Sequence, residues 1–146
     1  MNVNEDMQAA DAARLEVARK TMSGLFDLRW DIDRRPGEPE AAGDLARILL
    51  TQSFADSWSR AGLDARSRSL VTLGITIALG TTKEFGHHVA GALMLGISPD
   101  EIVEVLIHAA SYCGAPRTTA AWTVARKILA ARAADPSDPG AAASST

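Results

Sequence analysis

The chain has 146 residues, of which 47% are hydrophobic and 23% are charged, and its formal net charge at pH 7 is -3. This size fits one globular domain with a core of its own, and this balance of residues excludes a disordered chain. No basic stripe stands out in a net acidic chain, so no nucleic-acid partner is expected. No apolar run approaches the ~20 residues that a membrane-spanning helix needs, so no membrane association is expected.

A single cysteine, Cys113, excludes an intrachain disulfide and a Cys-x-x-Cys redox pair. The first residues are acidic and polar, whereas a secretory signal needs a basic start followed by an apolar run. We therefore expect a cytoplasmic protein in a reducing compartment.

Good helix formers dominate the first part of the chain. The apolar positions of residues 8–26 follow a helical period, and residues 31–40, rich in proline and glycine, predict a loop. A second helix is predicted over residues 41–59. Together with the helices that follow them, we assign these segments to one helical domain that covers residues 1–133.

Two further helices are predicted on either side of Gly80. Residues 65–79 contain enough β-branched side chains to allow a buried strand, but their length and the C-cap position of Gly80 favour a helix. The next helix is predicted over residues 83–95, with Thr81 or Thr82 as its N-cap. A segment as apolar as residues 65–79 belongs in the core or in a subunit interface.

Ser98, Pro99 and Glu101 form the strongest local signal, a capping box with proline at the first helical position. It predicts a fifth helix that starts at Pro99 and continues to Tyr112.

Gly114 ends this fifth helix, and Pro116 opens a sixth that continues to about residue 133. Residues 134–146 are mainly alanine, serine, proline, glycine and aspartate and predict a disordered tail. About six helices joined by short turns, without alternating strands, predict an all-α fold.

Two glutamate–histidine pairs carry the candidate chemistry. Glu84 precedes His88 by four residues and Glu104 precedes His108 by four, so each pair shares one helix face, which Tyr112 extends beyond His108. A carboxylate beside an imidazole orients the ring and raises its pKa, which suits proton transfer near neutral pH. If the two faces meet, acids and bases converge on one pocket. An ordinary surface ion pair is the alternative for each.

Two arginines could hold an acidic substrate. Arg66 and Arg68 stand at the start of the helix predicted over residues 65–79, and a guanidinium group binds a carboxylate through paired hydrogen bonds. A solvated or subunit-bridging position is the alternative for both. His87 competes with His88 for the catalytic role, because one residue turns a helical side chain by about 100°.

A metal centre is the second chemical hypothesis, because two glutamates and two histidines could bind iron or zinc. Ferritin-like di-metal proteins, however, place glutamate and histidine three residues apart and add further glutamates. The spacing here is four, and the His-Glu-x-x-His motif is absent. We therefore expect no metal.

Several motifs together resemble the carboxymuconolactone decarboxylase family, over about residues 58–129. They are Trp58-Ser59-Arg60, Gly62-Leu63-Asp64, Arg66-Ser67-Arg68, Ala78-Leu79-Gly80, Glu84, His88, Gly96, Glu101, Glu104, His108, Tyr112, Gly114 and Pro116. The resemblance implies an all-helical fold shared with alkyl hydroperoxidase D, assembled as a trimer or hexamer. The third helix also offers more apolar surface than a small helical monomer readily covers, so a homo-oligomer is expected.

The hydroperoxidase branch of this fold carries Cys-x-x-Cys shortly before a histidine. If His88 is that histidine, Thr81 and Glu84 stand at the two cysteine positions. Dithiol chemistry needs two exchanging thiols, so the resemblance is to the decarboxylase branch.

That branch decarboxylates 4-carboxymuconolactone to an enol-lactone without a cofactor, because the unsaturation of the substrate accepts the electrons. The resemblance implies that His88 and Glu84 are the catalytic acid–base pair. The substrate-binding residues that it implies are Arg68, Arg66, His108, Tyr112 and Trp58.

The sequence also departs from the catabolic enzymes. Ala90 stands where they often carry an arginine, Met94-Leu95 replaces a polar pair, and a histidine near their first helix is missing. These changes make the pocket more apolar and less cationic. We therefore predict a cofactor-free decarboxylase or isomerase for a small organic acid or lactone, including a more apolar biosynthetic intermediate. The alternatives are a true 4-carboxymuconolactone decarboxylase and a non-catalytic, ligand-binding relative.

Overall fold

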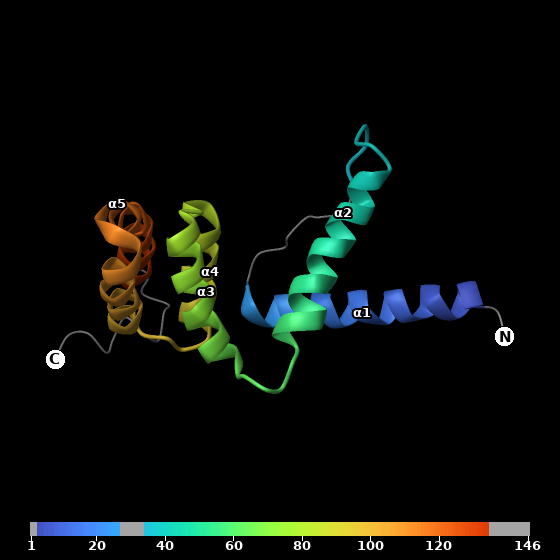
Figure 1. The fold of residues 1–146 in the computed structure, drawn as a ribbon, viewed down its shortest axis with the longest axis horizontal. Helices are drawn as coiled ribbons and strands as arrows, with labels where there is room; N and C mark the ends of the chain where they lie inside the picture. The colour runs from blue at the N-terminus through green and yellow to red at the C-terminus, as the bar shows by residue number, and fades with distance from the viewer. Residues whose placement is uncertain (1–2, 27–33, 135–146) are drawn as a thin grey trace. The chain divides into compact units, whose positions relative to one another are not determined.

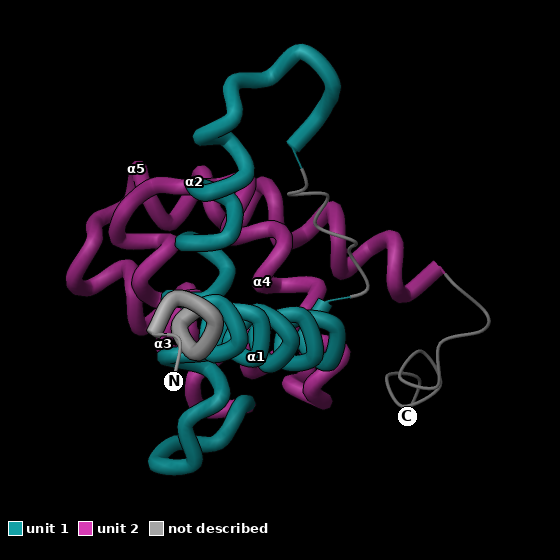
Figure 2. Tube along the Cα trace, turned by 90° about the vertical axis from the view of Figure 1, so that its right-hand side faces the viewer, with its two compact units in different colours: residues 1–65 teal, residues 66–146 magenta. Residues whose placement is uncertain are grey.

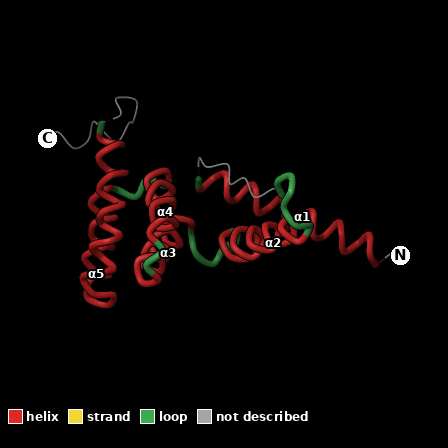
Figure 3. Tube along the Cα trace, turned by 90° about the horizontal axis from the view of Figure 1, so that it is seen from above, coloured by secondary structure: helices red, strands yellow, loops and turns green. Residues whose placement is uncertain are grey.

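A computed structural model of the chain describes residues 3–26 and 34–134, with side chains from residue 8 onwards. These residues form helices and connecting loops and contain no strand (Figure 3), which confirms the all-α prediction. None of their helices is long and apolar enough to cross a membrane. The predicted tail, from residue 135 on, and part of the first predicted loop lie outside the described residues.

The chain divides into two compact units, residues 1–65 and residues 66–146 (Figure 2). Unit 1 contains α1 (Val3–Leu25), α2 (Ala41–Leu50) and the π-helix η1 (Thr51–Trp58).

In unit 1, α2 and η1 follow each other without a break and cross α1 steeply (Figure 1). One α-helix was expected over residues 41–59, and its second half has π-helical hydrogen bonding instead. The change coincides with Thr51, whose hydroxyl donates to the carbonyl oxygens of Arg47 at 2.9 Å and Ile48 at 3.3 Å. Hydroxyls that donate back to a carbonyl one turn earlier bend and loosen a helix.

Aromatic packing joins α1 to η1. The Phe26 and Phe54 rings meet edge to face, with centroids 6.0 Å apart and an interplanar angle of 82°. The core of unit 1 consists of buried apolar side chains, namely Ala18, Met22, Leu25, Phe26, Leu50 and Phe54. Ion pairs from Arg14 to Asp56 and from Arg47 to Asp11 lie on the surface, where such pairs add little stability.

Unit 2 contains α3 (Ala65–Leu79), α4 (Thr82–Met94) and α5 (Pro99–Ala133). The bounds of α3 are the predicted ones. Gly80 ends α3 with a φ of +73°, and the amide of Thr81 donates to the carbonyl of Thr76 at 3.1 Å. Thr81 stands at the N-cap position of α4, as predicted, but its side chain accepts no hydrogen bond from an amide of that helix. Its hydroxyl faces the Thr76 carbonyl instead, at 3.5 Å.

The α5 element contains a reversal at Gly114, where φ is +77° and ψ is 163°, a conformation almost restricted to glycine. Residues 99–113 form its first arm and residues 115–133 its second arm, which confirms the predicted stop at Gly114. The capping box at Ser98 is also present, because Ser98 and Glu101 each accept a hydrogen bond from the other's backbone amide.

The three helices of unit 2 share one apolar core. Its members are Leu73, Ile77, Phe85, Val89, Ala92, Leu93, Ile97, Ile102, Leu106, Ala109, Ala121 and Ala125. Gly86 lets α4 approach the second arm closely, since a Cβ atom there would lie 3.0 Å from Cγ1 of Val124. This core fixes which flank of each helix remains available for a site.

Candidate active site and an apolar groove

The first candidate site lies on α4. Burial of Phe85, Val89 and Ala92 defines the core face of this helix, and Glu84 and His88 lie beside that face. His88 is half-buried and Glu84 is exposed.

The pKa of His88 is lowered from 6.5 to about 4. Burial is the main cause, the neighbouring His87 adds to the lowering, and Glu84 acts in the opposite direction with a smaller effect. Glu84 does raise this pKa, as expected, but the net shift is downward because desolvation of the imidazolium outweighs attraction by an exposed glutamate. His88 is neutral at pH 7. A neutral imidazole can donate one hydrogen bond and accept another.

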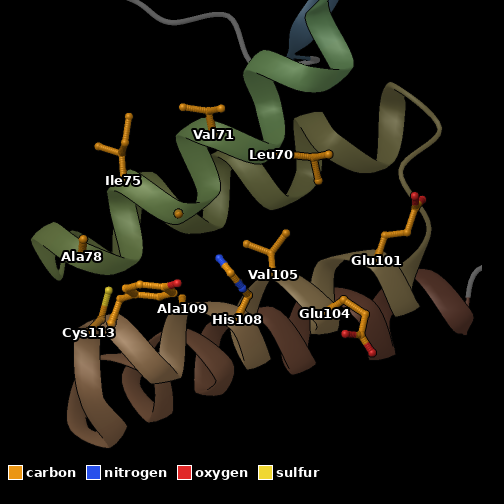
Figure 4. A pocket seen from close by; sticks show the side chains of 12 residues that line it. Leu70, Val71, Ile75, Ala78, Glu101, Glu104, Val105, His108, Ala109 and Cys113 are labelled. Carbon is orange, nitrogen blue, oxygen red and sulfur yellow. The ribbon is translucent and has the colours of Figure 1, made fainter.

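The second candidate site is a groove of about 810 Å³ between α3 and the first arm of α5 (Figure 4). Its α3 wall is made of small and aliphatic residues, namely Leu70, Val71, Gly74, Ile75 and Ala78. Its α5 wall carries the polar groups and consists of Glu101, Glu104, Val105, His108, Ala109, Tyr112 and Cys113. We call this site the α3/α5 groove.

Two aromatic rings lie one above the other on the α5 wall. The centroids of His108 and Tyr112 are 5.0 Å apart, with an interplanar angle of 50°. The imidazole of His108 points across the groove toward α3 (Figure 4). Tyr112 is 79% exposed, so its ring is open to solvent or to a ligand.

Glu101 and Arg66 close one end of the α3/α5 groove as an ion pair. The amide of Ser98 donates to Oε2 of Glu101 at 2.9 Å, and Arg66 donates to Oε1. The pKa of Glu101 is held below its usual value, mainly by the hydrogen bond from the Ser98 amide and then by the one from Arg66. Arg66 thus links the start of α3 to the start of α5.

The structure brings only some of the predicted site residues together. His108 and Tyr112 line the α3/α5 groove, with Arg66 at its end, whereas Glu84 and His88 do not line it. The two glutamate–histidine faces therefore do not converge on this groove.

Two other predicted residues also lie outside the lining. Arg68 is half-buried on α3 and is not part of the lining, although it stands on the same side of the helix as Val71 and Ile75, which line the groove. Trp58 belongs to unit 1, where its ring lies 6.5 Å from that of Phe54.

The sequence interpretation missed the apolar lining of this groove. Val71 and Ile75 were expected in the core or in a subunit interface. They are 55% and 50% exposed in the single chain, so they do not belong to its core. Cys113 is half-buried and also lines the groove. A four-residue repeat of Leu70, Gly74 and Ala78 marks this flank of α3 and could have indicated it.

Metal-binding residue types do not cluster in the described parts of the chain: no three His, Cys, Asp or Glu residues there are grouped so that they could hold a metal ion.

The fold and the α4 site define a small, all-helical protein with a neutral histidine beside a glutamate. The model of the carboxymuconolactone decarboxylase family matches residues 43–127, more than half of the chain, and the chain belongs to this family. The match starts within α2, earlier than the resemblance that begins at Trp58.

Two curated relatives are similar to the chain. The nitrosuccinic acid decarboxylase of Metarhizium robertsii is 43% identical over 95 residues, which are 65% of this chain and 61% of that protein. The 4-carboxymuconolactone decarboxylase of Acinetobacter baylyi is 32% identical over 86 residues, which are 59% of this chain and 64% of that protein. The chain thus spans less than two thirds of the length of either relative.

Proposed function

We propose that the chain is a cofactor-free decarboxylase that acts on a small organic acid. The observation that carries this proposal is its membership of the carboxymuconolactone decarboxylase family, together with two relatives that are both named as decarboxylases.

The two named acids share a chemical feature that defines the substrate class. In nitrosuccinic acid one carboxyl group stands on the carbon that carries the nitro group, and 4-carboxymuconolactone carries its carboxyl groups on and beside an unsaturated lactone ring. Each can accept the electron pair of the breaking C–C bond within its own structure. The balanced reaction is R–COO⁻ + H⁺ → R–H + CO₂, so the protein has to bind the acid, stabilise the developing anion and supply one proton.

We assign these tasks to three residues of unit 2. His88 in its neutral form donates a hydrogen bond to the charge that develops as carbon dioxide leaves, and it passes on the proton that the product carbon takes up. Glu84 lies one turn away on the same helix face and orients the imidazole. Arg68 binds a substrate carboxylate that does not leave. Arg66, His108, Tyr112 and Trp58 are not needed for this assignment.

We also propose that the chain works as a homo-oligomer, a trimer or a hexamer. The proposal is supported by Leu45, Ile48 and Leu49, which form one face of α2 and are each at least 50% exposed. Light scattering coupled to gel filtration gives the subunit number, and a monomer at micromolar concentration contradicts this proposal. The cytoplasmic location remains a prediction from the sequence.

The activity is tested by incubating the purified full chain with nitrosuccinic acid and, separately, with 4-carboxymuconolactone. Proton NMR follows the loss of each acid, and a coupled assay follows carbon dioxide. We expect turnover of at least one of them above the spontaneous rate. Binding of both acids without any product would contradict the proposal and favour a non-catalytic relative.

A further inference from the structure

The α3/α5 groove has the size and the walls of a small-molecule site. Ligand sites typically enclose ~300–1,000 Å³ and combine apolar walls with a few polar groups. The groove measures about 810 Å³, and its α3 wall presents Val71, Ile75 and Ala78 without any charged side chain. A ligand that fills it would cover apolar surface that now faces solvent.

The polar groups of the groove favour a flat ligand. The neighbouring His108 and Tyr112 rings, tilted by 50° to each other, stand on one wall, and the imidazole points toward the aliphatic side chains opposite (Figure 4). A planar ring between these walls would meet an aromatic edge or face on one side and methyl groups on the other. His108 and the Tyr112 hydroxyl can each donate or accept a hydrogen bond from a polar group on that ring.

The charge of the α3/α5 groove favours a different class of ligand from the acids proposed as substrates. Its lining contains no lysine or arginine, and Glu101 is already paired with Arg66. In the part of the chain that the structure describes, the carboxylate of Glu104 forms no ion pair. The groove therefore carries net negative charge, which repels a carboxylate and favours a neutral or cationic ligand.

We propose that the α3/α5 groove binds a neutral or cationic aromatic molecule, at a site separate from Glu84 and His88 on α4. The aromatic ring lies between Ile75 and the His108–Tyr112 pair, and a hydroxyl or amino group on the ring forms hydrogen bonds at the polar wall. Because this is a binding property of the groove alone, it holds whether or not the chain decarboxylates an acid.

The test uses two probes of the same shape, 2-naphthol and 2-naphthoate, titrated into the full-length protein by isothermal calorimetry at pH 7. We expect 2-naphthol to bind about tenfold more tightly, because a carboxylate a few ångströms from Glu104 is repelled. In a Glu104→Gln variant the difference should disappear, mainly through tighter binding of 2-naphthoate. Equal affinities in the unaltered protein would overturn the proposal.

Gly74 provides a matched pair of variants that fill the groove without disturbing the core. A Cβ atom at Gly74 meets no atom within 4 Å, and either replacement improves on glycine within a helix. Gly74→Leu should weaken 2-naphthol binding at least tenfold, whereas Gly74→Ala should change it less than about threefold. A His88→Ala variant should bind 2-naphthol as the unaltered protein does. Unchanged binding in Gly74→Leu would place the probe elsewhere and overturn the proposal.

Cys113 provides a second readout, because it is the only thiol of the chain and lines the groove. Bound 2-naphthol should slow the alkylation of Cys113 by iodoacetamide, and 2-naphthoate at the same concentration should not. If a second copy of the chain covers the groove instead, 2-naphthol fails to bind and Cys113 is protected without it. That outcome would also overturn the proposal.

Discussion

The α4 and α5 helices carry the same glutamate–histidine spacing, yet the two histidines occupy different environments. His88 is half-buried, and desolvation lowers its pKa to about 4. His108 is exposed, contacts the Tyr112 ring and lines the α3/α5 groove. A spacing of four residues fixes which side chains share a face, whereas the pKa depends on what packs against that face. The comparison separates a histidine that is neutral at pH 7 from one whose ring is open to ligand contact.

The largest effect is expected from removing each imidazole in turn. His88→Ala should lower the rate of decarboxylation by about 10²–10⁴-fold, the range typical of a lost proton-transfer group. His108→Ala should change that rate less than about threefold. Both rates are measured under saturating acid, with circular dichroism as the control for folding. If His108→Ala lowered the rate more than His88→Ala, the reaction would take place in the α3/α5 groove instead.

A substitution at Gly114 should disturb the α5 site while leaving α4 in place. Its φ of +77° and ψ of 163° are strained for any residue with a Cβ atom, so Gly114→Ala should cost about 1–3 kcal/mol in the free energy of unfolding. Denaturant unfolding measures this loss, and Ala115→Gly next to it is the control for a change in chain flexibility. A Gly114→Ala protein as stable as the parent would show that the reversal between the two arms is not required.

The loss of stability at acidic pH should also distinguish His88 from His108, with the next largest effect. The pKa of His88 is near 4 in the folded protein and 6.5 when it is unperturbed, so the unfolded chain binds more protons between these values. Stability is therefore fully present above pH 6.5 and is lost as the pH falls toward 4.

This loss should be smaller in a His88→Gln variant than in the parent protein, by a few °C at about pH 4.5. His108→Gln is the matched control and should follow the parent curve. Melting temperatures recorded by calorimetry from pH 7.5 to 4 provide the comparison. Parallel curves for His88→Gln and the parent would contradict the account of a buried, neutral His88.

The smallest effect on stability is expected at the two arginines. The Arg66–Glu101 pair is exposed, so Arg66→Ala should change the melting temperature by only about 2 °C or less. It should also leave KM for the acid within about threefold, whereas Arg68→Ala should raise KM about tenfold or more. Steady-state kinetics on both variants measure this difference. An equal rise of KM in both variants would show that Arg66 also binds the substrate carboxylate.

Local signals in the sequence located most of the helices because each depends on a few neighbouring residues. Gly80 and Gly114 adopt the positive φ that their positions at helix ends suggested, and Ser98 and Glu101 form their capping box as predicted. The π-helical hydrogen bonds of η1 were not predicted, since they differ from those of an α-helix by one residue of register and leave no clear pattern of apolar positions.

The sequence by itself determined the helical class, the family and the short list of titratable residues, because periodicity, caps and motifs are properties of residues close together in the chain. Only the tertiary structure decided that Glu84 and His88 lie outside the groove that His108 and Tyr112 line. It also decided that burial outweighs Glu84 at His88, and that Val71 and Ile75 remain exposed. Each of these outcomes depends on which helix flanks pack together, and the free energy of that packing is shared among residues far apart in the sequence.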